Sequence, residues 1–311
     1  MLYTPSLVAV VLAIALNAER RAPSAHEFTQ IHMGLPVRLV LHAPNRNAAE
    51  AAARDAFRRI ADLDRLMSDY RPDSELRAIE RSRAPVRVSA EMIAVLRRAV
   101  EIARATGGAF DPTVGPLVAL WREARAAHRL PDPAAIESAR NRVGWRHLEV
   151  ELSASTVRLA TPGMRLDLGG IAKGYILQEA LHVLRSRGVT RALVESGGDI
   201  VVGDAPPGRT GWRIAVPGAD AAFAARAATL SNAALSTSGP TAQFVEIDGV
   251  RYSHVVDPRT GVGLTNGITA HVIAADGATA DALATALTVL GEQAAAPILR
   301  RFPGVEWTTG R

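Results

Sequence analysis

The stretch MRLDLGGIAKGY, residues 164–175, predicts a strand that runs into paired glycines and then into a helix. The helix is expected over about residues 171–186, with Gly188 ending it. At such a turn, backbone N–H groups and the positive end of the helix converge, which favours an anion. The spacing differs from the GxxxxGKS/T pattern of a P-loop, and no GxGxxG pattern occurs. The stretch therefore predicts an anion site of another kind, with an ordinary strand-to-helix turn as the alternative.

Lys173, inside this stretch, is the only lysine in a chain whose lysines and arginines together number 36. An ammonium group is compact, whereas a guanidinium group is wide and planar. A lysine retained where every other basic side chain is an arginine therefore indicates a place that a guanidinium does not fit, with a chance remnant as the alternative. Asp167 adds a carboxylate at the end of the predicted strand.

The composition indicates a globular chain with material for one large domain or two ordinary ones. Of the 311 residues, 48% are hydrophobic and 22% are charged. The formal net charge is +5, but the arginines are interleaved with acidic residues and form no basic run, which predicts no nucleic-acid partner. The absence of cysteine from the sequence excludes disulfides, a thiolate metal site, a cysteine nucleophile and an acylated lipoprotein cysteine.

The first residues carry an apolar run at positions 7–16 that is shorter than a transmembrane helix. It resembles the apolar core of a secretory signal, although the positive region before it is missing and the cleavage site is poor. We expect residues 1–25 to be an export segment or an apolar extension, and residues 26–311 to form the functional domain. A buried element and a mis-assigned start codon are the alternatives.

The remaining pattern predicts strands in consecutive runs with helices between the runs, which is typical of an α+β fold. One amphipathic helix is expected to begin with a capping Asn47, and a second to run from Ser89 to Gly107. Asp248-Gly249 predicts the turn of a hairpin. Strands are expected at residues 36–43, 191–196, 200–203, 212–216 and 267–275, with two or three between 148 and 166, and helices at 278–290 and 293–301.

The segment ATADALATAL, residues 278–287, places Asp281 and Thr285 four positions apart on a predicted helix, so that they share one face. Both offer oxygen, the ligand type that Mg²⁺ prefers, and Mg²⁺ commonly takes few protein ligands and several phosphate oxygens. The alternative is structural: an aspartate suits the first helical turn, and a threonine can bond to a backbone carbonyl one turn earlier.

Other polar residues stand next to small or turn-forming residues. His254 in YSHVVDPRTG, residues 252–261, is a candidate general base at the end of a strand, or a structural histidine. Phe110 and Asp111 lie in a loop rich in glycine and proline, where they could contact a heteroaromatic ring or hold the loop. ESGGD at 195–199 and STSG at 236–239 are strand ends where a ligand could approach the backbone, or plain turns.

Seven segments, in their order along the chain, resemble the ApbE family of FAD:protein FMN transferases. They are MSDYRPDSEL, GGAFDPTVGPLVALW, DLGGIAKGY, VESGGDIVV, ALSTSG, HVVDPRTG and ADALATAL. The resemblance covers about residues 33–291. It implies the α+β fold of that family, with mixed or antiparallel sheets and helices packed around an FAD cleft between two subregions.

The resemblance also implies roles for individual residues. Gly170, Asp281 and Thr285 match a Mg²⁺ site to which the glycine contributes its carbonyl oxygen. His254 matches the family's proposed base, and we expect His254 and Lys173 to be the catalytic residues. The positions that match FAD contacts are Met33, Tyr70, Ala109, Phe110, Asp111, Asp167, Lys173 and Val256.

The activity implied by the resemblance is Mg²⁺-dependent transfer of FMN from FAD to a Ser or Thr hydroxyl of a client flavoprotein, with release of AMP. The client would be a subunit of a redox pump or an electron-transfer complex. Two other activities fit the same residues: an FAD pyrophosphatase that yields FMN and AMP, and a flavin-binding carrier without chemistry. Family habit favours the periplasm with a weak membrane association through residues 1–25, or the cytoplasm if that segment is no signal.

Overall fold

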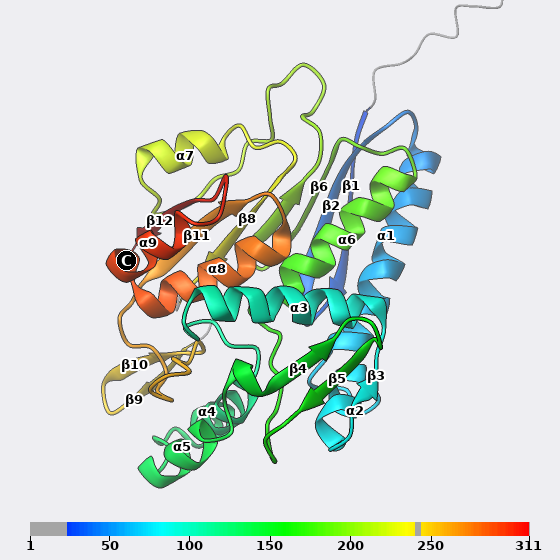
Figure 1. The fold of residues 1–311 in the computed structure, drawn as a ribbon. Helices are drawn as coiled ribbons and strands as arrows, with labels where there is room; N and C mark the ends of the chain where they lie inside the picture. Colours follow the sequence, from blue (N-terminus) through cyan, green and yellow to red (C-terminus); the bar gives the residue numbers. More distant parts are fainter. Residues whose placement is uncertain (1–23, 240–243, 311) are drawn as a thin grey trace, which may run out of the picture.

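A computed structural model describes residues 24–239 and 244–310 of the chain. Within these residues, the centre of the fold is an antiparallel sheet of seven strands in the order β1-β2-β6-β7-β8-β11-β12 (Figure 1). The strands are β1 Ser24–His32, β2 Leu35–Ala43, β6 Ala192–Ser196, β7 Asp199–Val202, β8 Ala233–Ser238, β11 Thr269–Ala274 and β12 Glu306–Gly310.

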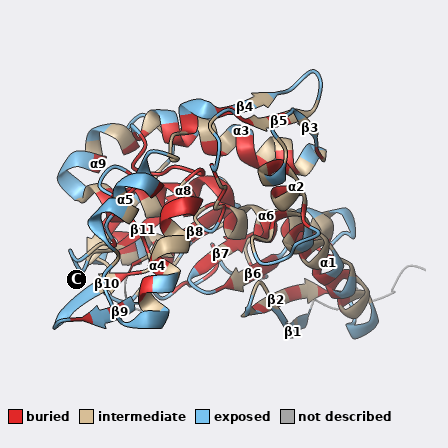
Figure 2. Cartoon of the chain, turned by 90° about the horizontal axis from the view of Figure 1, so that it is seen from below, coloured by how far each residue is buried: buried red, intermediate tan, exposed pale blue. Residues whose placement is uncertain are grey.

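Helices α1 (Arg46–Met67), α6 (Ala172–Ser186) and α8 (Gly277–Leu290) pack on one face of this sheet, and α3 (Ala90–Ala105) packs on α8. Along β2, the residues Val37, Leu39 and Leu41 alternate toward these helices and are fully buried. Burying one such leucine contributes about 2 kcal/mol. Figure 2 shows the buried residues along the sheet and around α8, which is covered on nearly all sides. The main core thus lies between the sheet and α1, α6 and α8.

The opposite face of the sheet is covered only in part. Helix α7 (Ala221–Ala227) and residues 212–219 pack over β7, β8 and β11, where Trp212, Phe223 and Leu235 form a second apolar cluster. Toward β1 and β2 this face carries polar side chains, including the ion pair of Arg38 with Glu195 at 2.6 Å.

The remaining described elements surround the main layers. They are α2 Glu75–Arg81, α4 Gly115–Ala127, α5 Pro133–Arg140, a 3-10 turn Trp145–His147, α9 Glu292–Leu299, the small sheet of β3 Val86–Arg87, β4 Leu148–Glu151 and β5 Thr156–Leu159, and the hairpin of β9 Phe244–Ile247 and β10 Val250–Ser253. The hairpin turns at Asp248-Gly249 with φ of 51° and 75°, as predicted.

The α+β class is confirmed, and several local predictions are wrong. The cap of α1 is Asn45 and not Asn47, since the Asn45 side chain accepts a hydrogen bond from the Ala48 N–H. Residues 164–168 and 212–216 form no strand, because each stretch has only an isolated bridge, at Arg165 and at Trp212. The sequence pattern also missed β1, β12, α2, α4, α5 and α7.

The predicted export segment, residues 1–25, lies outside the described residues except for its last two positions, which begin β1. Among the helices of the described ranges, none has both the length and the apolar character that a bilayer crossing requires.

Candidate functional site

The N-terminal ends of α6 and α8 meet in direct backbone contact. Gly174 of α6 and Gly277 of α8 lie so close that a Cβ on either residue would overlap the carbonyl oxygen of the other. Only glycines allow two backbones to approach in this way. The start of α6 brings the positive end of its dipole to this junction, whereas at the start of α8 the Gly277 N–H is bonded to the Gln178 side chain and the Thr279 N–H to the Asp276 carboxylate. The electrostatic preference for an anion at the junction therefore comes from the start of α6.

Asp281 and Thr285 lie on the side of α8 that faces the start of α6. The Asp281 side chain is buried, and its Oδ2 accepts a hydrogen bond of 3.1 Å from the Gly174 N–H. Thr285 Oγ1 lies 2.9 Å from the point that a Cβ of Gly170 would occupy. The structure thus brings together the backbone of Gly170, a carboxylate and a hydroxyl.

The Lys173 side chain reaches from α6 to the turn between β6 and β7. Its Nζ donates a hydrogen bond of 3.1 Å to the Gly197 carbonyl and lies 3.2 Å from Asp199 Oδ2. Asp199 Oδ1 accepts a hydrogen bond from the Ser236 hydroxyl. ESGGD and STSG predict strand ends where a ligand could approach the backbone, or plain turns, and neither interpretation singles out the side chains of Asp199 and Ser236. The sequence does contain a signal for Asp199, since an acidic residue follows the paired glycines 197–198 and begins an apolar strand.

Lys173, Asp199 and Asp281 form a cluster whose charges influence one another, because the two carboxyl groups are buried. Burial raises the pKa of Asp199, and Lys173 partly offsets this rise. Burial and the neighbouring Asp199 raise the pKa of Asp281 well above its usual value. Burial also lowers the pKa of Lys173, but Asp199 and Asp281 outweigh this effect, so that its pKa is raised. Lys173 is therefore charged at neutral pH, and its ammonium favours the charged form of both neighbouring carboxylates.

Ser196 adds a polar group without a partner beside this cluster. It pairs with Asp199 across β6 and β7, so that both side chains point to the same face of the sheet. Ser196 is only 2% exposed, and within the described ranges its Oγ has no hydrogen-bond partner. Because buried hydroxyls are almost always bonded, the unpaired Oγ is consistent with a polar ligand at this end of the sheet.

The loop before α4 presents one aromatic ring to the glycine turn. Phe110 Cε2 lies 3.4 Å from the Cβ position of Gly170. Asp111 instead holds the loop, since its oxygens accept hydrogen bonds from the Thr113 N–H, the Thr113 hydroxyl and the Trp145 N–H. Burial raises the pKa of Asp111. Of the two alternatives left open for Asp111, the described contacts are those of a residue that stabilises the loop.

The other predicted flavin contacts, Asp167, Met33 and Tyr70, lie in three different loops. Asp167 accepts a hydrogen bond of 2.8 Å from the Gly169 N–H, and its own N–H donates to the Pro112 carbonyl. Met33 lies at the turn between β1 and β2 with φ of 52°, and its N–H donates to Asp64. Tyr70 is largely exposed.

His254 and Val256 follow the hairpin. His254 is half-buried at a bend directly after β10. The adjacent Val255 packs with Ala109 and with Val289 of α8, which places this segment beside the loop that carries Phe110. The Val256 side chain is buried against Leu117 and Trp121 of α4. A catalytic role for His254 and a flavin contact at Val256 stay predictions.

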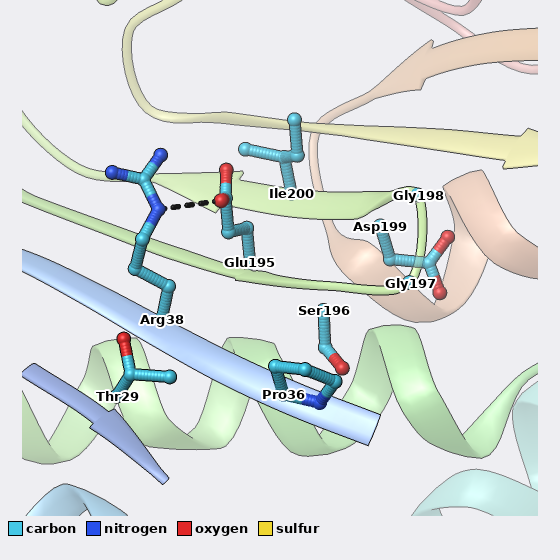
Figure 3. Close-up of a pocket in the computed structure, with 9 residues that line it drawn as sticks. All are labelled: Thr29, Pro36, Arg38, Glu195, Ser196, Gly197, Gly198, Asp199 and Ile200. Carbon is cyan, nitrogen blue, oxygen red and sulfur yellow. Dashed lines mark hydrogen bonds and ion pairs between the residues drawn. The ribbon is translucent and has the colours of Figure 1, made fainter. Parts of the chain in front are cut away.

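A hollow of about 390 Å³ lies on the open face of the sheet, beside the same β6–β7 turn (Figure 3). Thr29, Pro36 and the pair of Arg38 with Glu195 line it. The Asp199 side chain points away from this ion pair in Figure 3, in keeping with the alternation of β6 and β7. The hollow also reaches the β6–β7 turn, since Ser196, Gly197, Gly198 and Asp199 complete its lining. Its charged pair, Arg38 with Glu195, lies on the other face of the sheet from the Asp199 side chain, and we assign that pair no role in the cluster at Lys173.

Comparison with known proteins shows to which protein family the chain belongs. The sequence profile of the ApbE family matches residues 33–308. The chain belongs to the ApbE family. It is 33% identical to the FAD:protein FMN transferase of Treponema pallidum, over 96% of this chain and 88% of that protein. It is 35% identical to the FAD:protein FMN transferase of Vibrio cholerae, over 76% of this chain and 72% of that protein.

Solved structures of ApbE proteins share the fold. The crystal structure of the ApbE protein of Thermotoga maritima matches with a TM-score of 0.81 at 30% identity, over 92% of this chain and 94% of that chain. The apo form of the Pseudomonas stutzeri flavinyl transferase ApbE matches with a TM-score of 0.80 at 26% identity, over 93% of this chain and 92% of that chain. The predicted ApbE-like fold is therefore confirmed.

The residues at the α6–α8 junction of this ApbE protein fit a hard divalent cation bound together with phosphate. Within the described part of the chain, no group of three or more His, Asp, Glu or Cys side chains is placed to hold a metal alone. A cation there would need a backbone carbonyl, a hydroxyl and ligand oxygens besides Asp281, which is the mixed set that Mg²⁺ accepts. Thr285 and the backbone of Gly170 lie close to each other beside Asp281.

We expect Lys173→Arg to lower kcat/KM for FAD at least about tenfold, although it keeps the charge. Nζ lies close to the backbone of Gly197, so a planar guanidinium cannot replace the ammonium without displacing the turn. Steady-state kinetics with FAD measure the effect. Arg38→Lys, which changes a charged side chain on the opposite face of the same sheet, is the matched control. Unaltered kinetics in Lys173→Arg would make the lone lysine a remnant without a role.

Proposed function

We propose that this protein is an FAD:protein FMN transferase. The observation that carries the proposal is the junction of the two helix ends, where Gly170, Lys173, Asp281 and Thr285 converge. An FAD pyrophosphate bound there would lie near the positive end of α6 and the ammonium of Lys173, both of which favour phosphate. These groups also stabilise the negative charge that develops when the P–O–P bond breaks.

In the proposed reaction, the hydroxyl oxygen of a client Ser or Thr attacks the FMN phosphorus. A new P–O bond forms, the P–O–P bond breaks, and AMP leaves with the electron pair. The hydroxyl proton passes to His254, whose position after β10 lies beside the loop of Ala109 through Val255. The product is FMN joined to the client through a phosphodiester.

Mg²⁺ is the proposed cofactor, held by the Gly170 carbonyl, Asp281 and Thr285. When bound by these residues, Mg²⁺ would supply positive charge that offsets the charge of the pyrophosphate. The support is the closeness of two buried carboxyl groups, Asp281 and Asp199, and the proximity of Thr285 to Gly170. Lys173 offsets the negative charge of Asp199, and this ion pair holds the ammonium at the end of the sheet.

We also propose that the client is a flavoprotein subunit of a redox pump or an electron-transfer complex, and that transfer takes place in the periplasm. The support is the apolar run at residues 7–16, which resembles the apolar core of an export signal. A weak membrane association would follow if this segment is retained.

Purified protein mixed with FAD, Mg²⁺ and an acceptor domain is expected to give a covalently fluorescent acceptor after denaturation. EDTA should abolish this labelling, and added Mg²⁺ should restore it. AMP should appear in step with labelled acceptor. Fast AMP release without acceptor would instead identify a pyrophosphatase, and FAD binding without AMP release would identify a carrier. Labelling that is indifferent to EDTA would remove Asp281 and Thr285 from the mechanism.

A further inference from the structure

Tyr70 is an exposed aromatic residue whose loop is held in place from two sides. The side chain is 78% exposed and lies in the loop between α1 and α2. The guanidinium of Arg77 donates a hydrogen bond to the Asp69 carbonyl, and that of Arg122 forms an ion pair with the Asp69 carboxylate. The backbone next to Tyr70 is therefore fixed by arginines of α2 and α4.

Arg122 also contacts the Tyr70 ring itself. The guanidinium carbon lies 4.8 Å from the ring centroid, which is the geometry of a cation–π contact. The same guanidinium lies 3.5 Å from Asp167 Oδ2. One side of Tyr70 is thus covered by a planar cation, while most of the side chain faces solvent.

These contacts join Tyr70 to the α6–α8 junction. Asp167, which contacts Arg122, accepts the hydrogen bond from Gly169 at the start of the glycine turn. Gly170, the next residue, lies against Thr285. The exposed ring of Tyr70 is thus connected to the glycine turn through Arg122 and Asp167. A dinucleotide whose phosphates lie at this turn has that ring nearby.

We propose that Arg122 is a positioning residue that holds the Tyr70 ring as a stacking surface for a planar ring of FAD. This inference rests on the proposed function. An exposed tyrosine without a neighbour would lose side-chain freedom when a ring stacked on it, whereas a ring already held by Arg122 has little freedom left to lose. Lysine would supply the charge but not the flat surface or the simultaneous contacts with Asp69 and Asp167.

The test measures FAD binding by titration calorimetry and by flavin fluorescence, separately from transfer. We expect Arg122→Met to weaken FAD binding roughly three- to tenfold and Arg122→Lys to recover only part of the loss. Transfer at saturating FAD should fall much less than FAD affinity. Tyr70→Leu should weaken binding to a similar extent, whereas Tyr70→Phe, which keeps the ring, should bind normally.

A double-mutant cycle shows whether Arg122 acts through Tyr70. In the Tyr70→Leu background, Arg122→Met should add little further loss, because the stacking surface is already absent. Additive losses would overturn the proposal, and so would unchanged FAD affinity in Arg122→Met. Arg158→Met, which removes an arginine from the exposed ion pair with Glu149, is the control for charge. Thermal melts establish that each variant is folded.

Titration with FMN and with AMP identifies the ring that stacks. A loss of affinity for FMN, with loss of its fluorescence quenching, assigns the flavin to Tyr70, and a loss of affinity for AMP alone assigns the adenine. Equal affinities of parent and Arg122→Met for both ligands would refute the stacking surface. These readouts require no acceptor protein, so failure of the transferase assay and failure of the stacking proposal are distinguishable.

Discussion

Asp281→Asn is expected to lower the rate of FMN transfer at saturating FAD by about a hundredfold or more. Asparagine keeps the volume of the side chain and can still accept the hydrogen bond from the Gly174 N–H. It removes the negative charge that the proposed Mg²⁺ site needs. The measurement is the initial rate of covalent acceptor labelling over a range of Mg²⁺ concentrations.

Stability separates this functional role of Asp281 from a structural one. The buried Asp281 is repelled by Asp199, so that the neutral asparagine should leave the melting temperature unchanged or raise it. Activity and stability are thus expected to change independently, as they do at sites maintained for function. Asp62→Asn, in an exposed pair with Arg65 on α1, is the control. A parental transfer rate in Asp281→Asn would exclude Asp281 from catalysis.

Gly174→Ala is expected to lower the free energy of unfolding by about 3 kcal/mol or more. The added methyl group would overlap the Gly277 carbonyl, and a backbone atom inside a buried helix pair cannot move without separating the helices. Gly277→Ala should show the same defect for the reciprocal reason. Chemical denaturation followed by circular dichroism measures the loss.

Gly304→Ala is the matched control for the loss of conformational freedom. Gly304 has a φ of 71° but nothing within contact distance of an added Cβ, so only the backbone strain of about 1 kcal/mol is expected. If Gly174→Ala were no more destabilising than Gly304→Ala, the two helix ends could not be in the direct contact that defines the junction.

The sequence predicted those parts of the site that depend on helical spacing. Asp281 and Thr285 are four positions apart on a helix, and a helix fixes such neighbours locally. Asp199 depends on a different element: it joins Lys173 only because β7 begins beside α6, a contact between distant parts of the chain. No local pattern contains that information.

Two errors have specific physical causes. Gly115 and Pro116 suggested a loop, yet proline is well tolerated in the first turn of a helix, and α4 begins there. Arg122 on that helix was therefore overlooked. Residues 164–168 have the composition of a strand, but the N–H groups of Leu166 and Asp167 bond to the Glu80 side chain and the Pro112 carbonyl. Tertiary partners thus replaced strand pairing there.

The pairing of β2 with β6 has a consequence for the order of folding. Arg38 and Glu195, which face each other across these strands, are 157 residues apart in the chain. Closing so long a loop has a high entropic cost, and contacts of this kind slow the search for the native state. The same holds for Asp281 and Gly174, which are 107 residues apart, so the junction forms only after α6 and α8 have both been made and packed together. A chain in which these two helices have not yet packed therefore has no junction to offer a nucleotide.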